Sequence, residues 1–162
     1  MKLIITDLDK LKMGRKYKYS KNSLTKILSV KPDLQAVCHR ALEIANNRKL
    51  HCPDFGVSQG IRTQEEQFQL FKIGREYNAS MKDYVVTGDI VTNCDGVFKK
   101  SNHQGGNAVD VYAYVGGKAN YDTDNLALIA TCFMQAASEI GVKLVWGGNY
   151  ESFIDGAHFE LV

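Results

Sequence analysis

The stretch Ser101-Asn102-His103-Gln104-Gly105-Gly106-Asn107-Ala108-Val109-Asp110 organises the interpretation of this 162-residue chain. It places a histidine and an aspartate seven positions apart, with two consecutive glycines between them. Apolar and polar residues alternate from Ala108 to Tyr114, which predicts a β-strand that begins inside the stretch. The glycines allow the backbone to turn back before that strand, so His103 and Asp110 can reach one point in space.

A second cluster with similar chemistry lies near the C-terminus. It is Asp155-Gly156-Ala157-His158-Phe159-Glu160, on the last predicted strand. His103, Asp110 and His158 would together supply two neutral imidazoles and one carboxylate. A catalytic zinc ion typically takes three such protein ligands and keeps one position for water. Spacing alone leaves the ordinary alternative open, in which these histidines are surface residues or hydrogen-bonded core residues.

A hydrolytic site also needs a group that accepts a proton from water. Asp155 stands three residues before His158, a spacing at which it can face the metal without becoming a ligand. Glu160 is two residues after His158 and therefore on the same face of the strand. We predict that Asp155 is the general base, and that Glu160 is a hydrogen-bond partner of a ligand or an alternative base.

Hydrophobic periodicity and capping signals predict both helices and strands. The predicted helices cover residues 33–46 and 123–140, with a third that begins at the Thr63–Glu66 capping box, and the predicted strands cover residues 55–61, 108–114, 142–146 and 157–162. The connections are too irregular for a parallel βαβ array. We therefore expect an α+β fold, with a small, mainly antiparallel sheet and helices packed on one side. Residues 74–100 predict either a short hairpin, with strands 84–86 and 89–91, or a loop over the site.

Size and composition are those of one soluble globular domain, residues 1–162, with 44% hydrophobic residues and no apolar run long enough to span a bilayer. The N-terminal apolar stretch is too short for a signal peptide, so we expect a cytoplasmic protein that reaches any external target by lysis or a separate export route. The four cysteines form no CxxC pair, and Cys38 and Cys132 are predicted to be buried free thiols. His39 and His51 stand alone and are interpreted as ordinary surface or core residues.

The net charge of +2 is unevenly distributed. The stretch from Lys10 to Lys31 holds eight basic residues and no acidic one, and it overlaps a predicted basic N-terminal arm, residues 1–20. Such a stretch can attract a polyanion, whether nucleic acid, a membrane surface or an anionic cell wall. The alternative is a solvated arm without a specific partner.

Taken together, the motifs resemble those of one enzyme family. The pattern Ser101-x-His103-x-x-Gly106-x-Ala108-x-Asp110, followed by Trp146-Gly147-Gly148 and Asp155-x-x-His158, is similar to that of the zinc peptidases of bacterial cell walls. These include D-Ala-D-Ala carboxypeptidases and dipeptidases of the VanY and VanX type. Within that group the chain is most similar to phage endolysins that are L-alanyl-D-glutamate peptidases. Further matching motifs are Asn22-Ser23-Leu24, Val30-Lys31-Pro32-Asp33-Leu34, Arg40-Ala41-Leu42-Glu43, Gln59-Gly60-Ile61-Arg62-Thr63 and His158-Phe159-Glu160-Leu161-Val162.

The resemblance implies a hedgehog-like or D,D-peptidase-like fold and a Zn²⁺ cofactor held by His103, Asp110 and His158. It implies Asp155 as the general base, where the carboxypeptidases usually have glutamate. It also implies that Arg62 binds substrate and stabilises the oxyanion, a role suited to a guanidinium. Weaker supporting or substrate-binding positions are Ser101, Gln59, Trp146 and Glu160.

The function that follows is a zinc-dependent peptidoglycan endopeptidase, an endolysin that hydrolyses the L-Ala–D-Glu bond of peptide stems. We expect a monomer whose partners are peptidoglycan stems, with residues 10–31 attracted to the anionic wall and with no nucleic-acid partner. Two alternatives stay open, namely a D,D-carboxypeptidase on the same scaffold and a non-catalytic, zinc-containing wall-binding module. Residues 74–100 form a longer segment than the resemblance leads us to expect, which leaves the substrate detail open.

Overall fold

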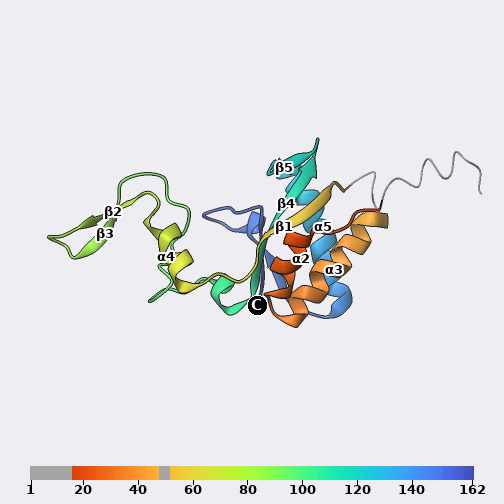
Figure 1. Ribbon diagram of the computed structural model, residues 1–162, viewed down its shortest axis with the longest axis horizontal. Coiled ribbons are helices and arrows are strands. Elements are labelled where there is room, and N and C mark those ends of the chain that lie inside the picture. The colour runs from red at the N-terminus through yellow and green to blue at the C-terminus, as the bar shows by residue number, and fades with distance from the viewer. Residues whose placement is uncertain (1–15, 48–51) are drawn as a thin grey trace, which may run out of the picture.

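The computed structural model describes residues 16–47 and 52–162, and it has the predicted mixture of helices and antiparallel sheet (Figure 1). The helices are α2 (Lys21–Leu28), α3 (Pro32–Asn47), α4 (Gln64–Lys72) and α5 (Thr123–Ile140), with two short 3-10 helices, η1 (Asn102–Gly105) and η2 (Gly147–Asn149). The strands are β1 (Asp54–Gln59), β2 (Arg75–Asn78), β3 (Asp83–Val86), β4 (Ala108–Val115), β5 (Lys118–Asn120), β6 (Leu144–Trp146) and β7 (His158–Leu161). No helix in these two ranges is long and apolar enough to cross a membrane.

Strand β4, which begins inside the opening stretch, is central to the main sheet. The five strands follow the order β1-β4-β7-β6, with β5 also paired to β4, and all these pairings are antiparallel. In the register between β4 and β7, Asp110 stands directly opposite His158. Opposite residues of antiparallel strands have Cα atoms about 4.5–5.5 Å apart, so the pairing alone brings two predicted ligands together. This confirms the expectation that His158 comes from a strand beside Asp110.

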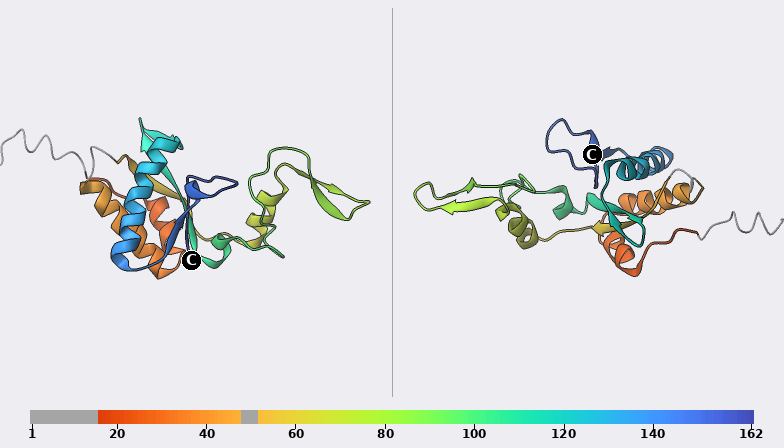
Figure 2. Two further views of the ribbon diagram at one scale, coloured as in Figure 1. Left: turned by 180° about the vertical axis from the view of Figure 1, so that it is seen from behind. Right: turned by 90° about the horizontal axis from the view of Figure 1, so that it is seen from above.

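The two faces of this sheet carry different chemistry. Val109, Val111 and Phe159 are completely buried in the hydrophobic core, and α3 and α5 supply the other half of that core. Figures 1 and 2 show both helices on the same side of the sheet. Because side chains alternate along a strand, Asp110 and His158 point to the opposite face. The predicted one-sided helix layer is confirmed, and it leaves the other face for the candidate site.

Helix α5 begins and ends where the periodicity predicts. It covers Thr123–Ile140, and Gly141 ends it in the left-handed conformation with a φ of 84°. Its Phe133 ring stacks on Phe159 of β7 with 4.4 Å between ring centroids. This contact ties the main helix to the strand that carries His158.

Helix α2 is an element that the sequence analysis missed. Ser20 caps it by accepting a hydrogen bond from the Ser23 backbone N–H, and only Ser23 and Ile27 of its eight residues are buried. Such a short helix with so few apolar positions gives little periodic signal, and its stability depends on packing. Just before it, Tyr17 and Tyr19 pack against the core, so residues 16–20 of the predicted basic arm lie on the domain. Residues 1–15, with Lys10, Lys12 and Arg15, lie outside the described ranges.

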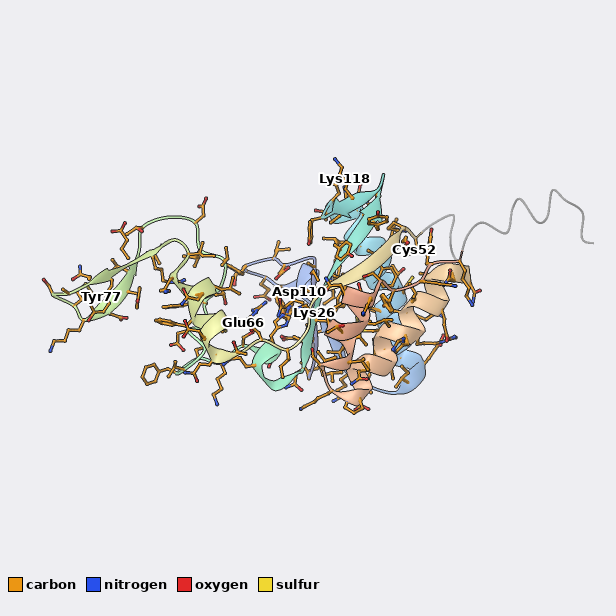
Figure 3. All side chains as sticks on the ribbon, in the orientation of Figure 1. Lys26, Cys52, Glu66, Tyr77, Asp110 and Lys118 are labelled. Carbon is orange, nitrogen blue, oxygen red and sulfur yellow. The ribbon has the colours of Figure 1, made fainter. Side chains whose placement is uncertain are left out.

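The segment after Arg62 extends away from the main sheet (Figure 1). Thr63 and Glu66 form the predicted capping box at the start of α4. A hairpin follows, and the predicted strand 84–86 lies within Asp83–Val86. Its predicted partner was wrong, because Asp83–Val86 pairs with Arg75–Asn78 and residues 89–91 form no strand. The Asn78 carboxamide oxygen accepts hydrogen bonds from two backbone N–H groups in the turn, which favours this earlier register. Figure 3 labels Tyr77 on this hairpin, far from Asp110.

The four cysteines are free thiols. Cys38 and Cys132 are buried, as predicted, and so is Cys52. Burial raises the pKa of the Cys38 thiol to about 12, so this group stays protonated and unreactive near neutral pH. Cys94 is the partly exposed one of the four, in the segment that follows the hairpin.

Candidate metal centre

Three ligand-type side chains converge on the open face of the sheet. His103 Nε2 lies 3.2 Å from Asp110 Oδ1 and 3.2 Å from His158 Nδ1, and His158 Nδ1 lies 3.0 Å from Asp110 Oδ1. His103 comes from η1, Asp110 from β4 and His158 from β7. These three residues form a group that could hold a metal ion. In the described part of the chain, no second group of three or more His, Cys, Asp or Glu side chains is arranged in this way.

The turn that carries His103 is built from the residues around it. The Ser101 side chain and the Gln104 side chain form a capping box around η1, so Ser101 shapes the turn. Gly106 then ends η1 in the left-handed conformation with a φ of 68°, which glycine adopts without strain. The chain can therefore reverse into β4 within a few residues, as the glycine-containing motif predicted.

The His103 ring is oriented by a backbone carbonyl. His103 is 2% exposed, and its Nδ1 lies 2.8 Å from the carbonyl oxygen of Gly60, just after β1. Because that carbonyl can only accept, Nδ1 carries the proton and Nε2 presents a lone pair to the cluster. A Cβ at Gly60 would collide with the carbonyl oxygen of Lys26, so only glycine brings this backbone close enough.

A carboxylate orients the His158 ring in the same way. His158 Nε2 lies 2.9 Å from Glu160 Oε2, which also accepts a 2.6 Å hydrogen bond from the Asn102 side-chain amide. The Tyr150 hydroxyl also donates a hydrogen bond to Glu160. Burial and the negative charge of Glu160 raise the pKa of Tyr150, so its hydroxyl stays protonated and remains a donor. Glu160 therefore holds the proton on Nε2 of His158 and leaves Nδ1 to face the cluster.

With these tautomers, the cluster consists of three acceptors that face one another without a donor between them. Two imidazole lone pairs and a carboxylate oxygen repel one another unless a cation or protons lie among them. When protons rather than a cation lie there, burial would still raise the pKa of Asp110, but the hydrogen bonds and positive charges of the protonated His103 and His158 rings outweigh this and hold the pKa well below its ordinary range. The arrangement fits a cation with nitrogen and oxygen ligands.

Asp155 lies beside this cluster without belonging to it. It lines the same cleft, and its carboxylate accepts a 3.2 Å hydrogen bond from the backbone N–H of Ala157. The Trp146 indole N–H donates to the carbonyl oxygen of Gly156 at 2.8 Å, which anchors the loop next to Asp155. A Cβ at Gly148 would collide with the Trp146 ring, so the Trp-Gly-Gly motif is explained by this packing.

Arg62 also lies beside the cluster and lines the cleft. One of its guanidinium nitrogens lies 3.5 Å from Asp110 Oδ2, and another donates a 2.8 Å hydrogen bond to the side-chain oxygen of Gln67. The Arg62 side chain is 12% exposed, so its charge is held near the cleft rather than in bulk solvent. Its backbone N–H also donates to the carbonyl oxygen of His103, which ties the chain between β1 and α4 to η1.

The cleft above the cluster has a volume of about 490 Å³ and is open to solvent. One wall comes from the segment after the hairpin, residues 91–94, and from Lys99 and Lys100. Tyr150, Phe153 and Asp155 supply a further part of the lining. Residues 74–100 thus contain both alternatives that the sequence left open, a hairpin and a loop that lines the site.

The family model for the phage L-alanyl-D-glutamate peptidases matches residues 15–162. The chain belongs to this family. It is 33% identical over 158 residues to the L-alanyl-D-glutamate peptidase of Escherichia phage T5, with 90% of this chain and 98% of that protein covered. It is also similar to the crystal structure of the L-Ala D-Glu endopeptidase ChiX of Serratia marcescens, with a TM-score of 0.68, 26% identity, and 98% and 96% of the two chains covered.

In this family member, most sequence-predicted site residues lie together. The cleft is lined by Arg62, Ser101, His103, Asp110, Asp155, His158 and Glu160. Gln59 and Trp146 are not among the lining residues, since Gln59 donates to the Ile61 carbonyl and Trp146 anchors the Gly156 carbonyl.

Four further residues shape the site of this family member and were not predicted. They are Gly60, Asn102, Tyr150 and Gln67, of which Gly60 and Asn102 stand inside or beside quoted motifs. Gly60 acts through its backbone carbonyl, which every residue type has. The glycine itself, required there by the close approach of the backbone, is the signal that the sequence offered. Gln67 stands five positions from Arg62 and 27 positions from Cys94, and no motif signals either Gln67 or Tyr150.

Proposed function

We propose that this protein is a zinc-dependent peptidoglycan endopeptidase of the endolysin type, which hydrolyses the L-Ala–D-Glu bond of peptide stems. Family membership supports the reaction, since the phage T5 and Serratia relatives are named for that bond. The observation that carries the proposal is the convergence of His103, Asp110 and His158 at a cleft that also holds Asp155 and Arg62.

The donor set supports zinc as the ion. Two imidazole nitrogens and one carboxylate oxygen are typical zinc ligands, whereas calcium and magnesium prefer oxygen ligands alone. The donor atoms are 3.0–3.2 Å apart. That separation is close to the roughly 3.3 Å expected between ligands of a tetrahedral zinc ion. When bound, zinc supplies Lewis-acid chemistry, which polarises a carbonyl group and lowers the pKa of a water molecule.

The protein's own groups then have separate tasks. The Asp155 carboxylate accepts a proton from the attacking water and passes it to the leaving amine nitrogen of D-Glu. The Arg62 guanidinium donates hydrogen bonds to the negative oxygen that develops on the attacked carbonyl. Glu160 holds the His158 ring, and its Oε2 is already occupied by two hydrogen bonds, which supports Asp155 rather than Glu160 as the base.

Binding to the wall is a further part of the proposal. We propose that the basic stretch 10–31 concentrates the enzyme on the anionic wall and that the enzyme works as a monomer, without a nucleic-acid partner. Lysines of this stretch are exposed in the described part of the chain, at Lys16, Lys18, Lys21 and Lys31. Salt should weaken such binding, because it screens interactions between exposed charges. Cytoplasmic accumulation before release stays a prediction from the N-terminal sequence, which lies outside the described ranges.

Digestion of purified peptidoglycan by the zinc-loaded protein tests the function. Mass spectrometry should find new D-Glu amino termini, whereas release of free D-Ala would identify a D,D-carboxypeptidase. Asp155→Asn should lose cleavage and keep its zinc, and Asp124→Asn, an acidic position on α5 away from the cleft, is the matched control. Absence of any cleavage by the zinc-loaded wild type would leave a non-catalytic wall-binding module and end the enzyme proposal.

A further inference from the structure

Gln67 is a completely buried polar side chain that the reaction described above does not use. It lies on α4, is 0% exposed, and is one of three buried polar residues among those described, with Ser23 and His103. A buried carboxamide is costly unless its oxygen and its N–H groups find partners. The hydrogen-bond partners of Gln67 therefore indicate the role of this side chain.

Those partners come from two parts of the cleft. The Gln67 side-chain oxygen accepts a 2.8 Å hydrogen bond from the Arg62 guanidinium. Its amide nitrogen donates to the carbonyl oxygen of Cys94 at 2.8 Å and to the Thr92 hydroxyl at 3.3 Å. Arg62, Thr92 and Cys94 all line the cleft. One side chain thus joins the proposed oxyanion group to the wall that residues 91–94 form.

Packing around Gln67 leaves little freedom for this connection. A Cβ placed on Gly96 would stand 3.0 Å from the Gln67 Cβ and Cγ atoms, so the chain after Cys94 rests on the Gln67 stem. Gly96 has a φ of 84°, and its carbonyl oxygen accepts a 2.9 Å hydrogen bond from the Gln104 side chain of η1. The wall is therefore fixed between α4 and η1, the 3-10 helix that carries His103.

We propose that Gln67 is a positioning residue of the active site, which holds the Arg62 guanidinium in its working orientation and fixes the cleft wall at residues 92–94. This inference rests on the proposed function for the role of Arg62. An arginine side chain has many rotamers, and a group that stabilises a transition state must stand within a fraction of an ångström of its place. The carboxamide accepts from Arg62 through its oxygen and donates to the wall through its nitrogen at the same time.

Two substitutions separate these two contacts. Gln67→Met keeps the volume and loses both contacts, while Gln67→Glu keeps an acceptor for Arg62 and loses the donors to the wall. Gln69→Met is the matched control, because Gln69 lies on the same helix and hydrogen-bonds only Glu65 on the exposed surface. We expect kcat on muropeptides to fall on the order of tenfold in Gln67→Met. We expect a clearly smaller loss in Gln67→Glu, and no change in KM or zinc content beyond about twofold in either variant.

The contribution of Arg62 is isolated by repeating Gln67→Met in an Arg62→Lys background. Lysine keeps a charge but cannot reach both Gln67 and the cleft with separate nitrogens. If Gln67 acts through Arg62, the second substitution lowers kcat by less than about twofold in that background. A tenfold loss in both backgrounds would overturn the positioning role, because the effect would not pass through Arg62.

The wall contact has a readout that does not depend on hydrolysis. Cys94 is the partly exposed thiol, while the other three cysteines are buried, so a thiol reagent modifies Cys94 first in the native zinc-loaded protein. We expect several-fold faster modification of Cys94 in Gln67→Met and in Gln67→Glu, and the wild-type rate in Gln69→Met. Unchanged rates in both Gln67 variants would overturn the wall contact. The rate of Cys94 modification is independent of whether the proposed function holds, because failure of that function would be seen as a wild-type protein without hydrolytic activity.

Discussion

The hydrogen bond between Glu160 and His158 predicts how strongly a residue outside the ligand set controls metal affinity. Glu160→Ala removes the acceptor that stands 2.9 Å from His158 Nε2 and 2.6 Å from the Asn102 amide nitrogen. The proton of the imidazole is then no longer held on Nε2, and the ring is free to turn. Both changes reduce the time that Nδ1 presents its lone pair to the metal.

The magnitude follows from the burial of this pair. Loss of such an outer partner typically costs 10–100-fold in metal affinity, about 1.4–2.7 kcal/mol. The side chains of His158 and Glu160 are only 12% and 17% exposed, so water replaces the carboxylate poorly. We therefore expect the upper half of that range, roughly 30–100-fold, for Glu160→Ala. Glu160→Gln keeps one acceptor oxygen and should lose about tenfold.

Zinc titration of the metal-free protein against a chromogenic chelator measures this directly. Glu76→Ala is the control, because Glu76 is exposed on the hairpin far from the metal centre. Circular dichroism shows whether the variants keep their fold. A Glu160→Ala protein that binds zinc within about twofold of the wild type would refute the argument that this carboxylate sets the His158 tautomer.

Three further predictions test packing, pH and the core. Gly60→Ala drives a methyl group against the Lys26 carbonyl. Urea denaturation should show that the free energy of unfolding falls by about 1–3 kcal/mol. An unchanged unfolding midpoint would contradict this. Burial lowers the pKa of His158, but hydrogen bonds and charges from Asp110 and Glu160 outweigh this and raise the pKa above its ordinary value in the metal-free protein. Zinc must displace the proton from His158, so the affinity for zinc should fall as the pH is lowered from about 8 to about 6 in calorimetric titrations. A zinc affinity that does not change with pH would contradict this prediction. Phe159→Ala removes a completely buried ring that stacks on Phe133. It should lower the free energy of unfolding by about 3–5 kcal/mol in the same urea assay, and a decrease of less than about 1 kcal/mol would contradict this.

The periodic elements were predictable because their signals are local. The bounds of α5 follow from apolar residues at helical spacing and from Gly141, and the capping box of α4 from Thr63 and Glu66. The hairpin was misassigned because Tyr84-Val85-Val86 can pair with chain on either side of it. Its actual partner is the strand before it, where the Asn78 turn and the packing of Tyr84 on Phe68 and Phe71 of α4 decide the register.

The sequence by itself determined the chemistry of the site. Ligand-type residues are rare and specific in kind, and the motif with His103, Asp110, Asp155 and His158 was sufficient to indicate a cell-wall peptidase, as family membership confirms. Tertiary structure alone decided how these groups are held. The proton positions depend on Gly60 and Glu160, and the cleft wall depends on Gln67. Hydrogen bonds act over about 3 Å, and which groups come that close is set by the packing of distant segments rather than by any local pattern.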